Sequence, residues 1–152
     1  MTRSRGLSGL RGFTLIEALT VLVVIVVLTA IAVPMWRNHQ LRVRRADAMA
    51  ALNAIQVSQD RFFGRMARYA TAEILSAEPP RGLGLAATSQ RGFYQIELRT
   101  AEDGLSYLAI ASAAPPGGQA GDTRCVQFSI DQSGIRRARD TAGEDRSADC
   151  WR

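Results

Sequence analysis

The sequence has 152 residues and a formal net charge of +5, and its 19 basic residues other than histidine are all arginine. This length suits one small domain beside a single apolar segment of about 20 residues. Three of the arginines (Arg3, Arg5 and Arg11) precede the apolar segment, and without them the net charge is only +2. This balance argues against a protein built mainly to bind nucleic acid.

The apolar segment is the most informative part of the chain. Residues 18–36 contain no charged side chain. A helix of this length rises about 28 Å, which is close to the thickness of the hydrocarbon core of a bilayer. The segment is also rich in valine and isoleucine, which membranes tolerate in helices. We expect it to lie in a membrane at some stage.

Two ordinary interpretations of this segment are available. The first is a secretory signal peptide with an A-x-A cleavage site at residues 30–32, although the apolar run is longer than a typical signal core. The second is a simple membrane anchor that contains Glu17. A carboxylate inside a bilayer is costly and needs a partner, so neither interpretation accounts for Glu17.

The residues before and at the start of the apolar segment favour a third interpretation. A short basic leader ends in Arg11-Gly12, and residues 13–17 read FTLIE. This combination resembles the cleavage and methylation motif of type IV prepilins. The resemblance implies a leader of residues 1–12 that a prepilin peptidase removes between Gly12 and Phe13. It further implies N-methylation of Phe13, filament assembly guided by Glu17, and a hydrophobic transmembrane and assembly helix at residues 13–36.

The motif has a physical rationale. Cleavage creates a positively charged α-amine at Phe13, and methylation keeps that charge. Glu17 lies one helical turn away, where it can meet the amine of a neighbouring subunit. Because an unpaired carboxylate in an apolar bundle is penalised, pairing would favour one axial register. The alternative is an interfacial glutamate without a function.

The topology is also implied by the resemblance rather than by charge. Arginines follow the apolar run as densely as they precede it, so the positive-inside rule does not place the N-terminus. A prepilin has a cytoplasmic N-terminus, a single pass through the inner membrane and a periplasmic globular domain, and then joins an extracellular filament.

Pro34 closes the apolar run and predicts a helix kink, with a helix stop as the alternative. An amphipathic pattern then resumes, which predicts one helix over about residues 14–66 and a globular domain at 37–152. Its expected packing stripe comprises Leu41, Ala48, Met49, Leu52, Ile55, Phe62, Phe63 and Met66. The residues expected on other faces are Asp47, Asn53, Gln56 and Asp60.

The amphipathic half of the helix, at 37–68, is followed by a connecting loop at 69–92 and a sheet at 93–139. Proline and glycine mark the loop, with a short helical turn expected at 71–76. Period-two patterns predict strands near 93–99, 106–110, 125–130 and 135–137. The predicted fold class is α+β: a type IV pilin fold with a long N-terminal helix packed on a three- to four-stranded antiparallel sheet.

The two cysteines, Cys125 and Cys150, bound a tail at 125–150. In an oxidising compartment they predict one disulfide, and the alternative is two buried free thiols. The C-terminal position of the pair also resembles the disulfide region of type IV pilins.

Catalytic and metal-binding patterns are absent from the sequence. His39 is the single histidine, and Asp131 with Ser133 and Gly134 is more typical of a turn than of a calcium loop. We therefore expect no enzyme, no cofactor and no metal. Two arginine clusters could contact phosphates, but solvated faces are the commoner explanation; they are Arg61, Arg65 and Arg68, and Arg136, Arg137 and Arg139.

Together these features predict a structural minor subunit of a type IV pilus, similar to the type IVa pilins of the PilE type. The resemblance implies a role in pilus biogenesis, twitching motility, adhesion or DNA uptake. Its partners would be other pilin subunits, the prepilin peptidase, the inner-membrane assembly machinery and membrane lipid. The alternative is a type II secretion pseudopilin, and a DNA-binding uptake pilin is the less favoured hypothesis.

Overall fold

The computed structural model describes residues 13–115, 119 and 121–152. The described chain divides into two units, one ending at Asn38 and one spanning His39–Arg152. Helix α1, Leu15–Met66, supplies residues to both units. It continues through Pro34, so the helix stop considered above is wrong. A kink at Pro34 stays a prediction.

Within the second unit, α1 has one buried face. Ala48, Leu52, Ile55 and Phe62 are buried at three- and four-residue steps, as the amphipathic pattern predicts. Met66 was expected on this face, but its side chain is 45% exposed. The helix ends just beyond it at Ala67, which adopts a positive φ of 53°, so Met66 no longer faces the sheet.

Two polar residues of α1 are buried with the apolar ones. Asp47 was expected on another face and is only 8% exposed, so that prediction is wrong. Its carboxylate accepts hydrogen bonds from the Ser89 hydroxyl and the Arg91 backbone N–H. Gln59 is fully buried, and its amide exchanges two hydrogen bonds with the backbone of Ala70. Both side chains satisfy loop backbone groups that burial would otherwise leave unpaired.

The connection after α1 is largely irregular. It contains one short 3-10 helix, η1 (Ala72–Ile74), inside the range expected to form a helical turn. Gly82 then passes close to the chain: a Cβ there would lie 2.1 Å from the Ile74 carbonyl oxygen, so only glycine fits. Backbone hydrogen bonds from Leu83 to Ile74 and from Leu85 to Leu75 fold the segment back on itself.

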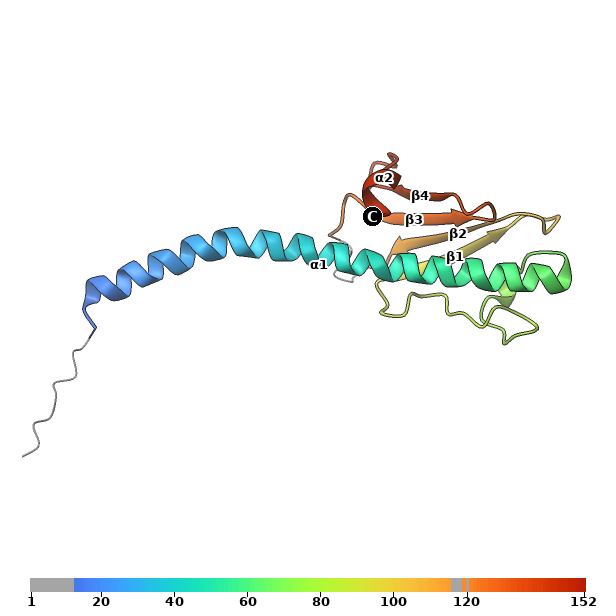
Figure 1. The fold of residues 1–152 in the computed structure, drawn as a ribbon, viewed down its shortest axis with the longest axis horizontal. Helices are drawn as coiled ribbons and strands as arrows, with labels where there is room; N and C mark the ends of the chain where they lie inside the picture. The colour runs from blue at the N-terminus through green and yellow to red at the C-terminus, as the bar shows by residue number, and fades with distance from the viewer. Residues whose placement is uncertain (1–12, 116–118, 120) are drawn as a thin grey trace, which may run out of the picture. The chain divides into compact units, whose positions relative to one another are not determined.

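The sheet in the described residues has four antiparallel strands in the order β1-β2-β3-β4. They are β1 Tyr94–Thr100, β2 Tyr107–Ala113, β3 Gln127–Asp131 and β4 Arg136–Arg139. Consecutive strands pair, which confirms the predicted antiparallel sheet. In Figure 1 the green part of α1 runs along one side of this sheet. The predicted α+β class is therefore confirmed.

Alternation along the strands builds the core. Tyr94, Ile96 and Leu98 of β1 are buried, while the residues between them are exposed. Tyr94 and Phe128 meet edge to face, and Phe128 meets Trp151 in the same way, with ring centroids 5.8 and 5.7 Å apart. These contacts connect the first strand, the third strand and the chain end through one aromatic row.

Candidate functional site

The apolar stretch of α1 in the first unit exposes its side chains on all sides. Within the described residues, α1 is the one helix long and apolar enough to cross a membrane, and its 18-residue window has a mean hydropathy of 2.8 with no burial. The hydroxyls of Thr20 and Thr29 donate to helix carbonyls one turn back. Their polarity is therefore satisfied within the helix, and the stretch suits an apolar environment all round.

Phe13 lies two residues before α1, and Glu17 lies in its first turn. Gly12 lies outside the described residues, and Phe13 is 78% exposed. The Glu17 backbone N–H donates to the Thr14 hydroxyl at 3.3 Å, so Thr14 acts as the N-cap of the helix. The T-x-x-E pattern of residues 14–17 is the signal of a capping box, which the sequence analysis missed. Glu17 also lies where a negative charge favours the helix N-terminus.

A second polar site joins α1 to the connection between β2 and β3. The Arg45 guanidinium makes a two-pronged ion pair with Asp122, through Nε at 2.6 Å and Nη2 at 2.9 Å. Asp122 also accepts hydrogen bonds from the Gln119 side chain and the Cys125 backbone N–H. The Asp122 side chain is only 2% exposed, so removing Arg45 would leave a buried charge unpaired. No sequence pattern indicated this pair.

Cys125 and Cys150 form a disulfide with their Cα atoms 5.9 Å apart, which confirms the predicted bond and overturns the free-thiol alternative. Cys150 ends the short helix α2, Ser147–Cys150. The following Trp151 donates its indole N–H to the Arg137 carbonyl at 2.9 Å. The tail is thus held covalently and by its final aromatic side chain.

The residues before α2 are held by ionic hydrogen bonds. Arg146 donates to Asp140 at 2.9 Å and to Glu144 at 2.8 Å. The hydrogen bond from Arg146 holds the pKa of the Asp140 carboxyl below its usual range. This segment has few apolar side chains, so these contacts order it within the bounds of the disulfide.

The two arginine clusters have different arrangements. On β4, Arg137 and Arg139 project from the sheet face opposite the core. With Arg99 they border a 240 Å³ hollow over the strands. Arg136 points the other way: its guanidinium lies 5.3 Å from the Trp151 ring centroid and bonds Asn53. The predicted trio is therefore divided between two faces. Arg61 and Arg65 are exposed in the last two turns of α1, and Arg68 is exposed just after the helix.

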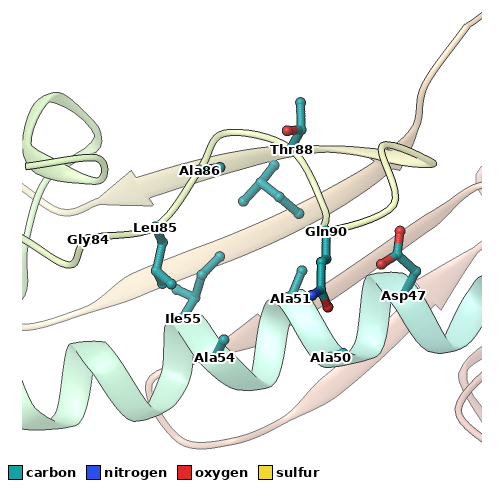
Figure 2. A pocket seen from close by; sticks show the side chains of 11 residues that line it. Asp47, Ala50, Ala51, Ala54, Ile55, Gly84, Leu85, Ala86, Thr88 and Gln90 are labelled. Carbon is teal, nitrogen blue, oxygen red and sulfur yellow. The ribbon is translucent and has the colours of Figure 1, made fainter.

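An apolar groove lies between α1 and the segment 84–90. Figure 2 shows Ala51 of the helix pointing toward this segment, and Ala50 and Ala54 also line the groove. The groove has a volume of about 310 Å³ and Ile55 and Ile96 also line it. The small alanine side chains create this space, and no sequence pattern predicted it.

Turn chemistry accounts for Asp131. Its carboxylate accepts hydrogen bonds from the backbone N–H groups of Ser133 and Ile135, both at 3.0 Å. Among the described residues, no group of three or more histidine, cysteine or acidic side chains could hold a metal ion. His39 lies exposed in α1.

Comparison with known proteins identifies the family of the chain. The model of the family described as "Type IV minor pilin ComP, DNA uptake sequence receptor" matches residues 34–129, which is more than half of the chain. The chain is 35% identical over 109 residues to the type IV major pilin protein PilA of Myxococcus xanthus (strain DK1622). That match covers 70% of this chain and 47% of the relative, so the chain spans about half the length of the relative.

A solved structure of a type IV pilin from Shewanella oneidensis is also similar, with a TM-score of 0.46 and 19% identity over 63% of this chain and 89% of that chain. The family match shows that the chain belongs to the type IV pilins, in the minor pilin family that the matching model describes. Members of this family are structural subunits that assemble with other pilins into filaments.

Proposed function

We propose that the chain is made as a prepilin, is cut between Gly12 and Phe13, and serves as a minor subunit of a type IV pilus. The observation that carries this proposal is the fully exposed apolar stretch of α1, with Glu17 as its one charged residue from Phe13 to Trp36. Such a surface needs lipid before assembly and neighbouring helices afterwards.

The proposed route follows from this surface. Before assembly, the first unit spans the inner membrane with its N-terminus in the cytoplasm, and the globular domain lies in the periplasm. The prepilin peptidase, the inner-membrane assembly machinery and other pilins are the proposed partners. The family match favours a pilus over a type II secretion filament, although the leader motif resembles both.

Glu17 sets the axial register in this proposal. The methylated amine of Phe13 in one subunit pairs with the Glu17 carboxylate of a neighbour. The pair is energetically favourable because an isolated carboxylate among apolar helices is costly. A subunit that is displaced along the filament axis loses this pairing.

Processing is tested by mass spectrometry of the mature protein. The expected N-terminus is N-methylated Phe13. A chain that instead begins at Val33, after the A-x-A sequence, would be the product of an ordinary signal peptidase and would overturn the proposal.

Assembly is tested with Glu17→Gln and Glu17→Ala. Glu17→Gln removes the charge but keeps the side-chain size and hydrogen bonding. Both variants should insert into the membrane and be cleaved, yet neither should enter filaments. The measurement is the ratio of filament-associated to membrane-associated subunit. Wild-type ratios for both variants would contradict charge pairing at Glu17.

DNA uptake is a second candidate role, because the matching family is described as a receptor for the DNA uptake sequence. The supporting observation is the hollow bordered by Arg99, Arg137 and Arg139 on the outer sheet face. Guanidinium groups on an open face can contact phosphates in a salt-dependent manner. The test is the binding of duplex DNA by the full chain at increasing salt. Arg137→Gln with Arg139→Gln should reduce the salt slope by about 2, and an unchanged slope would contradict this role.

A further inference from the structure

Basic side chains gather where the globular unit begins. The basic residues that follow the apolar stretch directly are Arg37, His39, Arg42, Arg44 and Arg45. Arg91 lies beside the same part of α1, because its backbone N–H donates to the Asp47 carboxylate at 3.3 Å. The positive-inside rule does not account for these charges, because it favours basic residues on the cytoplasmic side, whereas the proposed topology puts these in the periplasm.

The two acidic side chains that face these arginines are buried and already paired. Asp122 is bound by Arg45 from α1, so the charge of Arg45 is directed into the fold. Asp47 is 8% exposed and accepts hydrogen bonds from Ser89 and from the Arg91 backbone. Asp47 is also the one acidic residue in positions 39–59, and positions 81–94 contain none. The remaining arginines therefore have no nearby unpaired carboxylate.

The acidic residues of the tail are occupied by other groups. Figure 1 shows the tail, with α2, at the same end of the sheet. Asp140 and Glu144 bind Arg146, and Asp149 lies 3.6 Å from Arg124. Asp145 accepts the backbone N–H of Ser147. The positions that the structure does not describe (1–12, 116–118 and 120) include no acidic residue.

Arg44 is positioned by an aromatic contact. Its guanidinium carbon lies 4.8 Å from the centroid of the Phe93 ring. Stacking occupies one face of the planar guanidinium and leaves its N–H edge available for hydrogen bonds. The charge of Arg44 is therefore fixed in place but not neutralised.

Arg91 lies in an ordered turn directly before Phe93. The Gly92 N–H donates to the Ser89 carbonyl at 2.9 Å, and Gly92 has a φ of +74°, which suits glycine. The side chains of Arg91 and Arg42 are exposed. None of the three arginines forms an ion pair within the described residues. We call Arg42, Arg44 and Arg91 the juxtamembrane arginines.

Two of the juxtamembrane arginines follow the apolar stretch closely along the chain. Arg42 and Arg44 come six and eight residues after Trp36, which is about 9 and 12 Å along a helix. The headgroup region extends about 5–8 Å beyond the hydrocarbon core of a bilayer. Helix side chains lean toward the N-terminus, which here is the end with the apolar stretch. A long arginine side chain can therefore reach back to the headgroups.

We propose that the juxtamembrane arginines bind the phosphate groups of anionic phospholipids while the subunit is in the membrane. Guanidinium groups pair with phosphates through two parallel hydrogen bonds. This inference rests on the membrane-inserted stage of the proposed function and adds a preference among lipids. The apolar stretch cannot provide that preference, because contacts with hydrocarbon do not distinguish headgroups. A lipid is favoured over dissolved phosphate because the inserted helix holds the arginines at a high local concentration of headgroups.

The lipid selectivity of the inserted full chain tests the proposal. The chain is reconstituted in phosphatidylcholine nanodiscs that contain a trace of spin-labelled phosphatidylglycerol or spin-labelled phosphatidylcholine. Electron spin resonance measures the fraction of each labelled lipid that the protein immobilises. The ratio of the two association constants is the selectivity. The wild-type chain should prefer phosphatidylglycerol by at least about fivefold, which is the effect of one arginine near an anionic surface.

Substitution of the three arginines should remove this preference. Arg42→Gln, Arg44→Gln and Arg91→Gln together should lower the selectivity by about fivefold or more. Because Arg44 also packs on Phe93, the pair Arg42→Gln with Arg91→Gln is a second variant that keeps this contact and should lower the selectivity in the same direction. Near-UV circular dichroism verifies that both variants are folded. A wild-type selectivity in both variants would overturn the proposal.

A matched control removes the same charge at the other end of α1. Arg61→Gln, Arg65→Gln and Arg68→Gln together should leave the selectivity unchanged, because these residues lie far along the helix from the apolar stretch. An equal loss in this control would show that the preference depends only on net charge, and would contradict a site at the juxtamembrane arginines.

Other sources of phosphate are distinguished in the same nanodiscs. The selectivity should disappear at about 1 M salt, where the Debye length is about 3 Å. At equal ionic strength, inorganic phosphate should lower it no more than chloride does. A specific effect of inorganic phosphate would indicate a site for the dissolved anion. Duplex DNA that binds the wild-type chain but not the triple variant would make nucleic acid the partner. Either result would overturn the lipid proposal.

Failure of this inference can be separated from failure of the proposed function. The nanodisc assay contains no filament, so it does not depend on the pairing of Glu17. If Phe13 is the mature N-terminus but the selectivity is absent, only the lipid proposal is wrong. If the mature chain begins at Val33, the apolar stretch is not retained, and both proposals fail.

Discussion

Helix α1 passes through two regions with different surfaces. From Leu15 to Trp36 it is apolar on every side apart from Glu17, and its side chains are exposed. From His39 onward it buries one stripe against the sheet, with Leu52 at its centre. The same secondary structure is therefore stabilised in two ways. One region depends on lipid or neighbouring helices, and the other depends on its own domain.

This difference also sets where polar groups are found. In the first region, threonine hydroxyls bond to the helix itself. In the second, Arg45, Asp47 and Gln59 reach across to loops and hold them. A polar side chain is thus tolerated in the first region when it is satisfied locally, whereas in the second it ties distant segments together. Substitutions should affect the two regions differently.

The sharpest contrast should come from matched leucines. Leu52→Ala removes a fully buried side chain and should lower the free energy of unfolding by about 2–5 kcal/mol. Leu22→Ala, at a position 60% exposed, should leave unfolding of the globular domain unchanged. Thermal unfolding of the full chain in detergent micelles, followed by near-UV circular dichroism, measures both. Equal losses would show that the two regions unfold as one cooperative unit.

Loss of the disulfide should act only on the second region. Cys125→Ala with Cys150→Ala opens a loop with a sequence separation of 25. In the chain-entropy model the expected loss of stability is roughly 3 kcal/mol. The same measurement, with reduced wild-type protein as the control, tests this value. A stable tail in the double variant would mean that Trp151 and the contacts of Arg146 are sufficient to hold it.

The buried amide of Gln59 should have a smaller effect. Gln59→Leu leaves the Ala70 N–H without its acceptor, while the Ala70 carbonyl keeps the hydroxyl of Thr100 as a donor. One buried unpaired N–H costs about 1–3 kcal/mol. Gln56→Leu, the same change at a half-buried position of the same helix, is the control in the same unfolding assay. A neutral Gln59→Leu would indicate that the loop after α1 rearranges freely.

Tyr94 should give no loss of stability at neutral pH. Its buried hydroxyl has no hydrogen-bond partner among the described residues. Because Tyr94→Phe removes this unpaired group, the free energy of unfolding should stay equal or rise, by at most about 1–3 kcal/mol.

The consequence of Tyr94 should appear in alkali. Burial raises the pKa of its hydroxyl, and the negative charge of Asp122 raises it further. The folded state therefore keeps a proton that the unfolded state loses, and stability should fall as the pH rises above about 10. Tyr94→Phe should make this fall shallower. An identical pH dependence in the variant would show that Tyr94 is not responsible.

Local patterns were sufficient to predict much of the fold. The uncharged run, the amphipathic spacing around Leu52 and Ile55, and the alternation in β1 each reflect burial that depends on neighbours along the chain. The two cysteines left one intrachain pairing to consider, and it forms. The prepilin motif lies at residues 11–17, and its processing and assembly roles stay predictions.

Contacts between residues far apart in the sequence could not be predicted from local patterns. Arg45 and Asp122 are 77 residues apart, and Asp47 and Ser89 are 42 apart. A helical wheel assigns Asp47 to a polar face because it includes no information about the loop residue Ser89, which donates a hydrogen bond to the carboxylate. The division of Arg136 from Arg137 depends on the pleat of β4 and on where Trp151 docks. The groove beside Ala54 forms where the loop at 84–90 packs opposite small side chains of α1. The amino-acid pattern therefore predicts which residues are buried, because that depends on the polarity and spacing of neighbouring side chains. It does not predict which distant residues they contact, because those contacts form only when the segments fold together.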